Sequence, residues 1–138
     1  MKKIIGIVVI IICVLALDYI AENHTNKTIS EITDMLIKLN EEIGDYKKDD
    51  DMKLDDDKKA KKLIKMSNEI LKTWREKDKV LSFYIEHDEI EKVSDKMNSF
   101  NKQIKTQNYN DAVVAIVETE FLLGHITEKQ SLKLKNIF

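Results

Sequence analysis

The sequence predicts an all-α protein in which an N-terminal transmembrane helix is followed by an antiparallel bundle of three to five helices. The chain has no Pro and only three Gly, so it lacks the residues that tight turns between strands need. Its apolar residues recur at alternating spacings of three and four, as they do along the buried face of a helix. At 138 residues, the chain is long enough for one domain at most.

An uncharged apolar segment lies close to the start of the chain. Two lysines precede Ile4 to Leu17, fourteen residues without a charge. At 1.5 Å per residue, a helix over Ile4 to Ala21 would be roughly 27 Å long, close to the thickness of a bilayer core. We therefore expect residues 1–21 to be a signal anchor that binds the lipid bilayer of the cytoplasmic membrane through Ile4 to Ala21. The lysines predict an N-terminus inside and residues 22–138 outside.

Two alternatives stay open for this segment, a cleaved signal peptide and a buried core helix. The length of the apolar run suits a signal peptide, and Ala16 is an acceptable small residue before a cleavage site. The run continues through Leu17 with no polar residues before such a site, which favours the uncleaved anchor. Cys13 follows three isoleucines and lacks the small neighbour of a lipoprotein signal. As the only cysteine, it also excludes an internal disulfide.

The first helix of the bundle is predicted from Thr28 onward, with a short interruption before it at residues 23–27, where Asn and Thr lower helix propensity. Its apolar stripe is Ile29, Ile32, Leu36, Leu39, Ile43 and Tyr46. A charged connection follows at residues 47–62, which contain almost nothing to bury. Alternating aspartates within it suggest a calcium loop, but Leu54 and Ala60 stand where an EF-hand needs Gly and Glu.

Two further helices are predicted by two apolar stripes whose helical registers differ by one residue. The second helix carries Leu63, Ile70, Trp74, Leu81 and Tyr84, with Trp74 as a core aromatic residue. The third carries Ile90, Val93, Met97, Phe100 and Ile104. The change of register predicts a break between Ile85 and Glu89. Asp88 and Glu91 resemble a capping box that starts the third helix.

A fourth helix is predicted over residues 111–126, after a turn at Asn108 to Asn110 with Asn110 as the N-cap. It is apolar around most of its circumference, which predicts a central position in the bundle. Thr127 and Gln130 suggest a new cap and a short final helix. That helix would return four apolar residues to the bundle: Leu132, Leu134, Ile137 and Phe138.

Four features of the second half of the chain stand out: Trp74, FYIEHDEI over residues 83–90, LLGHI over residues 122–126 and the ending LKLKNIF over residues 132–138. Together they resemble a small family of clostridial and related Gram-positive proteins, the domain of unknown function 4363 family. This likeness is specific from about Trp74 to Phe138. The resemblance implies membrane attachment, an all-helical fold and a spore-forming bacterial setting, and it implies nothing about chemistry.

Two histidines within the resembling stretches are weak candidates for a metal site. His87 and His125 would meet if the third and fourth helices form an antiparallel hairpin, with Asp88 or Glu91 and Glu118 supplying oxygen ligands. Glu118 lies seven residues before His125 and therefore on the same helix face. The alternative is structural: His87 and Asp88 cap a helix, and His125 interacts with the carbonyl end of another.

Other chemistry has little support in the sequence, and we expect no enzyme and no cofactor. The glycines are isolated, no Ser stands in a G-x-S-x-G turn, and Cys13 lies in the apolar segment. A net charge of −2 with Arg75 as the only arginine makes nucleic acid a poor partner. We expect a membrane-anchored interaction or structural module, paired with a membrane protein or a second copy. The alternative is a metal or small-ligand sensor that uses His87 and His125.

Overall fold

The computed structural model describes residues 1–48 and 56–135, and within them every regular element is a helix. The four helices are α1 (Lys2–Lys48), α2 (Asp56–Leu81), α3 (His87–Lys105) and α4 (Tyr109–Lys135). The predicted all-α class is confirmed. The aspartates of the suggested calcium loop before Asp56, and the apolar ending at Ile137 and Phe138, lie outside the described residues.

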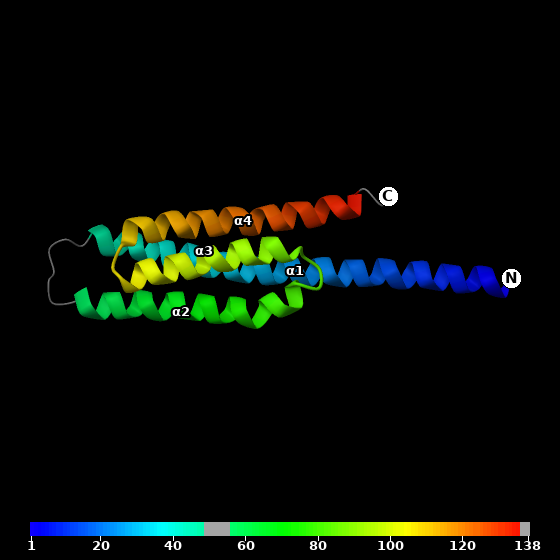
Figure 1. The fold of residues 1–138 in the computed structure, drawn as a ribbon, viewed down its shortest axis with the longest axis horizontal. Coiled ribbons are helices and arrows are strands. Elements are labelled where there is room, and N and C mark those ends of the chain that lie inside the picture. Colours follow the sequence, from blue (N-terminus) through cyan, green and yellow to red (C-terminus); the bar gives the residue numbers. More distant parts are fainter. Residues whose placement is uncertain (49–55, 136–138) are drawn as a thin grey trace.

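The helices pack in sequence order around one core. Helix α1 contacts α2 and α4, and α3 contacts the same two helices. Successive helices run in opposite directions along a common axis (Figure 1). The predicted stripes and α4 supply the largest fully buried side chains. Those from the stripes are Trp74, Phe100, Ile32, Leu36, Leu39, Ile43, Leu63, Ile70, Leu81, Met97 and Ile104, and Ile116 comes from α4. Each such side chain contributes about 1.5–3 kcal/mol when it leaves water, so these stripes hold the bundle together.

Helix α1 is continuous through residues 23–27, where the sequence predicted an interruption. The prediction was wrong because tertiary packing outweighs the low helix propensity of Asn and Thr. Thr25 and Thr28 face the bundle and are 0% and 3% exposed. One straight helix therefore connects the apolar N-terminal segment to the core.

Two hydrogen-bonded contacts fix α2 against α3. The indole Nε1 of Trp74 donates to Ser94 Oγ at 2.7 Å. The buried amide of Asn101 donates to Ser67 Oγ and to Asn68 Oδ1, both at 2.9 Å. Because these polar groups lose their bonds if either helix shifts by a turn, they define the register of the pair.

Both helix starts that the sequence predicted are displaced. Helix α3 begins at His87 with Glu86 as N-cap, and Glu86 makes no side-chain capping bond. Asp88 instead lies in the first turn, where its carboxylate pairs with Lys92 at 3.0 Å. Helix α4 begins at Tyr109 instead of Asp111, because the carbonyl of Asn108 already accepts a helical hydrogen bond from the amide of Ala112 at 3.0 Å. The predicted break between α2 and α3 and the turn before α4 are confirmed.

Helix α4 differs from its prediction in length and in position. It continues through Thr127, whose hydroxyl donates to the carbonyl of Leu123 at 3.2 Å within the helix instead of capping a new one. It is also no more central than the other helices. Its outward side chains Val114, Val117 and Phe121 are 58%, 50% and 75% exposed. The apolar circumference therefore covers a core face and a solvent face.

The N-terminal part of α1 projects beyond the bundle (Figure 1). Within the described residues, α1 is the helix that is long and apolar enough to cross a membrane. The most apolar window in it has no residue buried inside the structure. In this structure the segment lies outside the core of the bundle.

Candidate functional site

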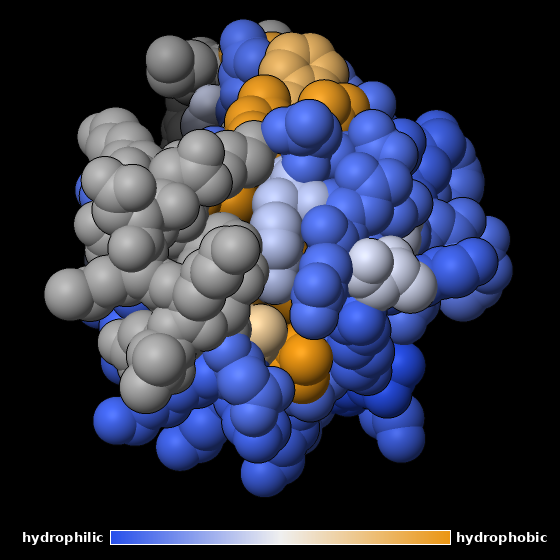
Figure 2. All heavy atoms as spheres, turned by 90° about the vertical axis from the view of Figure 1, so that its left-hand side faces the viewer, coloured by the Kyte–Doolittle hydropathy of each residue, from blue (hydrophilic) through white to orange (hydrophobic). Residues whose placement is uncertain are grey.

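The outer face of α4 exposes several large apolar side chains. We define this face by the exposed side chains Val114, Val117, Phe121, His125 and Leu132, whose spacings of three, four, four and seven residues place them on one stripe along the helix. Viewed from the end that carries the α3–α4 turn, the coloured surface is mostly hydrophilic, with hydrophobic side chains gathered at the upper edge on the side of α4 (Figure 2).

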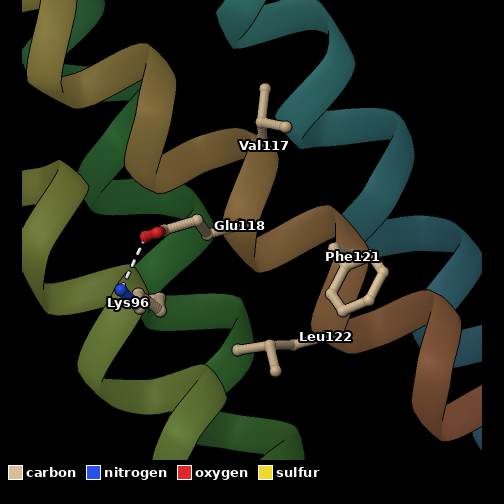
Figure 3. Close-up of a pocket in the computed structure, with 5 residues that line it drawn as sticks. All are labelled: Lys96, Val117, Glu118, Phe121 and Leu122. Carbon is tan, nitrogen blue, oxygen red and sulfur yellow. Dashed lines mark hydrogen bonds and ion pairs between the residues drawn. The ribbon is translucent and has the colours of Figure 1, made fainter.

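A shallow depression of about 430 Å³ lies where this face meets α3. Val117, Phe121 and Leu122 supply its apolar lining (Figure 3). Its border toward α3 is an ion pair between Lys96 Nζ and Glu118 Oε2 at 2.6 Å. An apolar strip next to a charged pair is suited to contact with another helix, because the strip supplies buried area and the charges supply orientation.

The four metal candidates lie on the surface of α3 and α4, and three of them have other partners. His87 Nε2 lies 3.1 Å from Glu91 Oε1 one turn later in α3. Asp88 pairs with Lys92, and this hydrogen bond and charge lower the pKa of the Asp88 carboxyl. Glu118 pairs with Lys96. His125 is exposed on the outer face of α4.

The antiparallel arrangement of α3 and α4 that the metal hypothesis requires is present. Lys129 Nζ of α4 lies 2.9 Å from Glu89 Oε1, close to the start of α3. The described residues nevertheless contain no group of three His, Cys, Asp or Glu side chains that could hold a metal ion. The arrangement of His87, Asp88 and Glu118 is that of surface ion pairs, and the metal site stays a prediction from sequence.

Sequence reasoning did not identify a polar groove of about 470 Å³ between α1 and α4. Asn26 and Asp34 of α1 and Glu120 and Glu128 of α4 are among its lining residues. Asn26 Oδ1 and Glu120 Oε1 are buried there without a hydrogen-bond partner, and burial raises the pKa of the Glu120 carboxyl. The lining of the groove therefore includes two buried acceptors. The signal in the sequence that could have indicated the groove is Glu120, a carboxylate in the middle of the apolar α4.

The fold defines a class: within the described residues, this is an all-helical protein with one long apolar N-terminal helix. The chain belongs to the family described as domain of unknown function (DUF4363), whose model matches residues 23–137. The resemblance found in the sequence is thereby confirmed, and it covers the whole bundle. Searches of curated proteins and of solved structures find no match.

Proposed function

We propose that this protein is a non-enzymatic interaction module, anchored in the cytoplasmic membrane by α1, whose bundle stands on the outer side and pairs with a second copy through the outer face of α4. The observation that carries the proposal is the continuity of α1. One helix contains both an exposed apolar segment and a quarter of the bundle core, so the position of the bundle follows that of the segment.

The apolar segment supports membrane insertion because its side chains have no protein partner. Ile4, Ile10 and Leu17 are among the side chains of this segment that are more than half exposed. Leaving them in water costs about 25 cal/mol for each Å² of apolar surface, and a bilayer core removes that cost. The lysines before the segment favour an N-terminus on the cytoplasmic side.

The geometry of anchoring determines how two copies can meet. Copies in one membrane have the same orientation, so their α4 helices can approach only in parallel. The spacing of Val114, Val117 and Phe121 suits a parallel helix pair, in which each residue of the stripe faces its own counterpart. The glutamate and lysine at the border with α3 lie beside this seam and would orient it.

The outer face of α4 offers only a small apolar area for pairing, so membrane attachment is needed to bring two copies together. A stable interface between soluble proteins buries at least about 1,000 Å² in total, and a single helix stripe supplies less. Confinement to one membrane raises the effective concentration of the second copy, so a small apolar seam can be sufficient. We therefore infer that the copies associate in the bilayer and separate when they are extracted and diluted.

Cysteine cross-linking of the full chain in lipid vesicles tests this proposal. In a Cys13→Ser background, Val117→Cys places a thiol on the outer face of α4, and Lys65→Cys places a matched control on the exposed side of α2. Mild oxidation should give a disulfide-linked dimer through residue 117 several times faster than through residue 65. Addition of Phe121→Ser should slow the reaction at residue 117.

Equal rates at the two positions would contradict pairing through α4. If residue 117 instead cross-links to a different membrane protein in cells, the partner is not a second copy and that part of the proposal is wrong. The comparison with residue 65 separates both results from random collision, because the two thiols are equally confined to the membrane.

A further inference from the structure

The turn between α2 and α3 presents an aromatic side chain to solvent on an ordered backbone. Phe83 is 83% exposed and Tyr84 is 39% exposed, whereas Ile85 is buried directly beside them. The amides of Tyr84 and Ile85 both donate to the carbonyl of Leu81 at 2.9 Å. Gln130 Nε2 of α4 donates to the Tyr84 carbonyl at 3.1 Å. The exposure of Phe83 is therefore a property of a fixed turn.

This turn lies level with the end of the proposed transmembrane segment. Lys62 Nζ of α2 lies 2.6 Å from Glu42 Oε1 of α1. Because the two helices are antiparallel, each residue further along α2 lies level with one residue earlier on α1. Counting in this way from the Lys62–Glu42 pair places Phe83 about level with Ala21. The turn lies at the end of the bundle from which α1 projects (Figure 1).

Three carboxylates beside the turn have lysine partners, and two lysines offset two of the three negative charges that would repel an anionic lipid surface. Lys129 of α4 lies 3.0 Å from Glu86 Oε1 and 2.9 Å from Glu89 Oε1. Asp88 is paired with Lys92. The opposite end of the bundle is mostly hydrophilic in its coloured residues (Figure 2). At the α2–α3 end, by contrast, Phe83 is 83% exposed, which gives that end an apolar group for contact with lipid.

We propose that the α2–α3 turn docks on the outer surface of the lipid bilayer, with Phe83 inserted among the upper acyl chains and Tyr84 at the level of the headgroups. Amphipathic and apolar aromatic side chains are stable at this depth. The inference rests on the proposed anchoring by α1 and adds a second membrane contact. With two contacts, the bundle has a fixed tilt and rotation, which determines the direction in which the outer face of α4 points.

Depth-dependent fluorescence quenching tests the docking in the full chain. In a Cys13→Ser background, Ser82→Cys carries an environment-sensitive dye beside Phe83, and Lys105→Cys carries it at the far end of α3 as the matched control. The protein is placed in vesicles of equal parts phosphatidylcholine and phosphatidylglycerol that contain lipids brominated in the upper acyl chain. We expect several-fold stronger quenching at residue 82 than at residue 105. Phe83→Ser should remove most of that difference.

Quenching of a dye on a different residue, Cys13, distinguishes insertion of α1 into the bilayer from docking of the α2–α3 turn on its surface. The dye on the native Cys13 reports whether α1 is in the bilayer. Strong quenching at Cys13 together with equal, weak quenching at residues 82 and 105 would overturn docking of the turn and leave the anchor intact. Quenching at residue 82 that persists after Phe83→Ser would overturn the role of Phe83. Absence of quenching at Cys13 would overturn the anchor and the docking together.

Discussion

The contact between Trp74 and Ser94 gives a quantitative prediction for the α2–α3 pair. Trp74 is 1% exposed, and its indole N–H donates to Ser94 Oγ at 2.7 Å. Ser94→Ala leaves that N–H buried without an acceptor, which costs about 1–3 kcal/mol of the free energy of unfolding. In a Trp74→Phe background no N–H remains to be left unpaired. There, Ser94→Ala should change the free energy by less than about 0.5 kcal/mol, since Ala also favours the helix.

Urea unfolding of the full chain in detergent micelles measures both values. Helical circular dichroism is the suitable signal, because Trp74→Phe removes the only tryptophan. The coupling between the two substitutions should be about 1–3 kcal/mol, the cost of the unpaired N–H. If Ser94→Ala costs the same in both backgrounds, the hydrogen bond does not contribute and the register of α2 against α3 depends on packing alone.

Three further predictions concern the polar groups. Asn101→Ala should cost about 1–2 kcal/mol in urea unfolding because two hydrogen bonds to α2 are lost; no change would contradict their role. Burial raises the pKa of the Glu120 carboxyl, which means that its charged form is disfavoured in the folded state. The free energy of unfolding therefore falls as the pH rises and this carboxyl becomes ionised. Glu120→Gln should therefore raise the melting temperature at neutral pH and lose this advantage in acid; equal melting curves at every pH would refute it. His87→Ala and His125→Ala should each change stability by less than about 0.5 kcal/mol, and elemental analysis of the purified chain should find no stoichiometric metal; a bound metal lost in both variants would restore the sensor hypothesis.

The sequence predicted most of the core correctly because heptad spacing and burial have the same physical origin. Tyr84 is the exception in the second stripe: it lies beyond the end of α2 and is 39% exposed. Ile32, Leu36 and Leu39 of the first stripe, and Val93 and Met97 of the third, are fully buried. The interruption predicted at residues 23–27 was wrong because it relied on local helix propensity, which competes with packing in the folded chain. The propensity cost of Asn and Thr at residues 23–27 is a few tenths of a kcal/mol per residue, which is small beside the burial of Ile29 and Ile32 in the same helix.

The surfaces were harder to predict because they depend on rotation and register between helices. The apolar circumference of α4 was compatible with a central helix, and the same residues Val114, Val117 and Phe121 prove to be exposed. The hairpin that would bring His87 and His125 together is present, but sequence spacing does not determine which way each side chain points. Nothing in the local sequence places Phe83 level with Ala21, because that relation depends on the register of α2 against α1.

The central claim, that α1 stays attached and lies in the membrane, is tested most directly by the mass of the mature chain recovered from cells. We predict that membranes washed at alkaline pH retain the chain with the segment Ile4 to Ala21 intact. Recovery of a shorter chain in the soluble fraction, with that segment missing, would contradict the account.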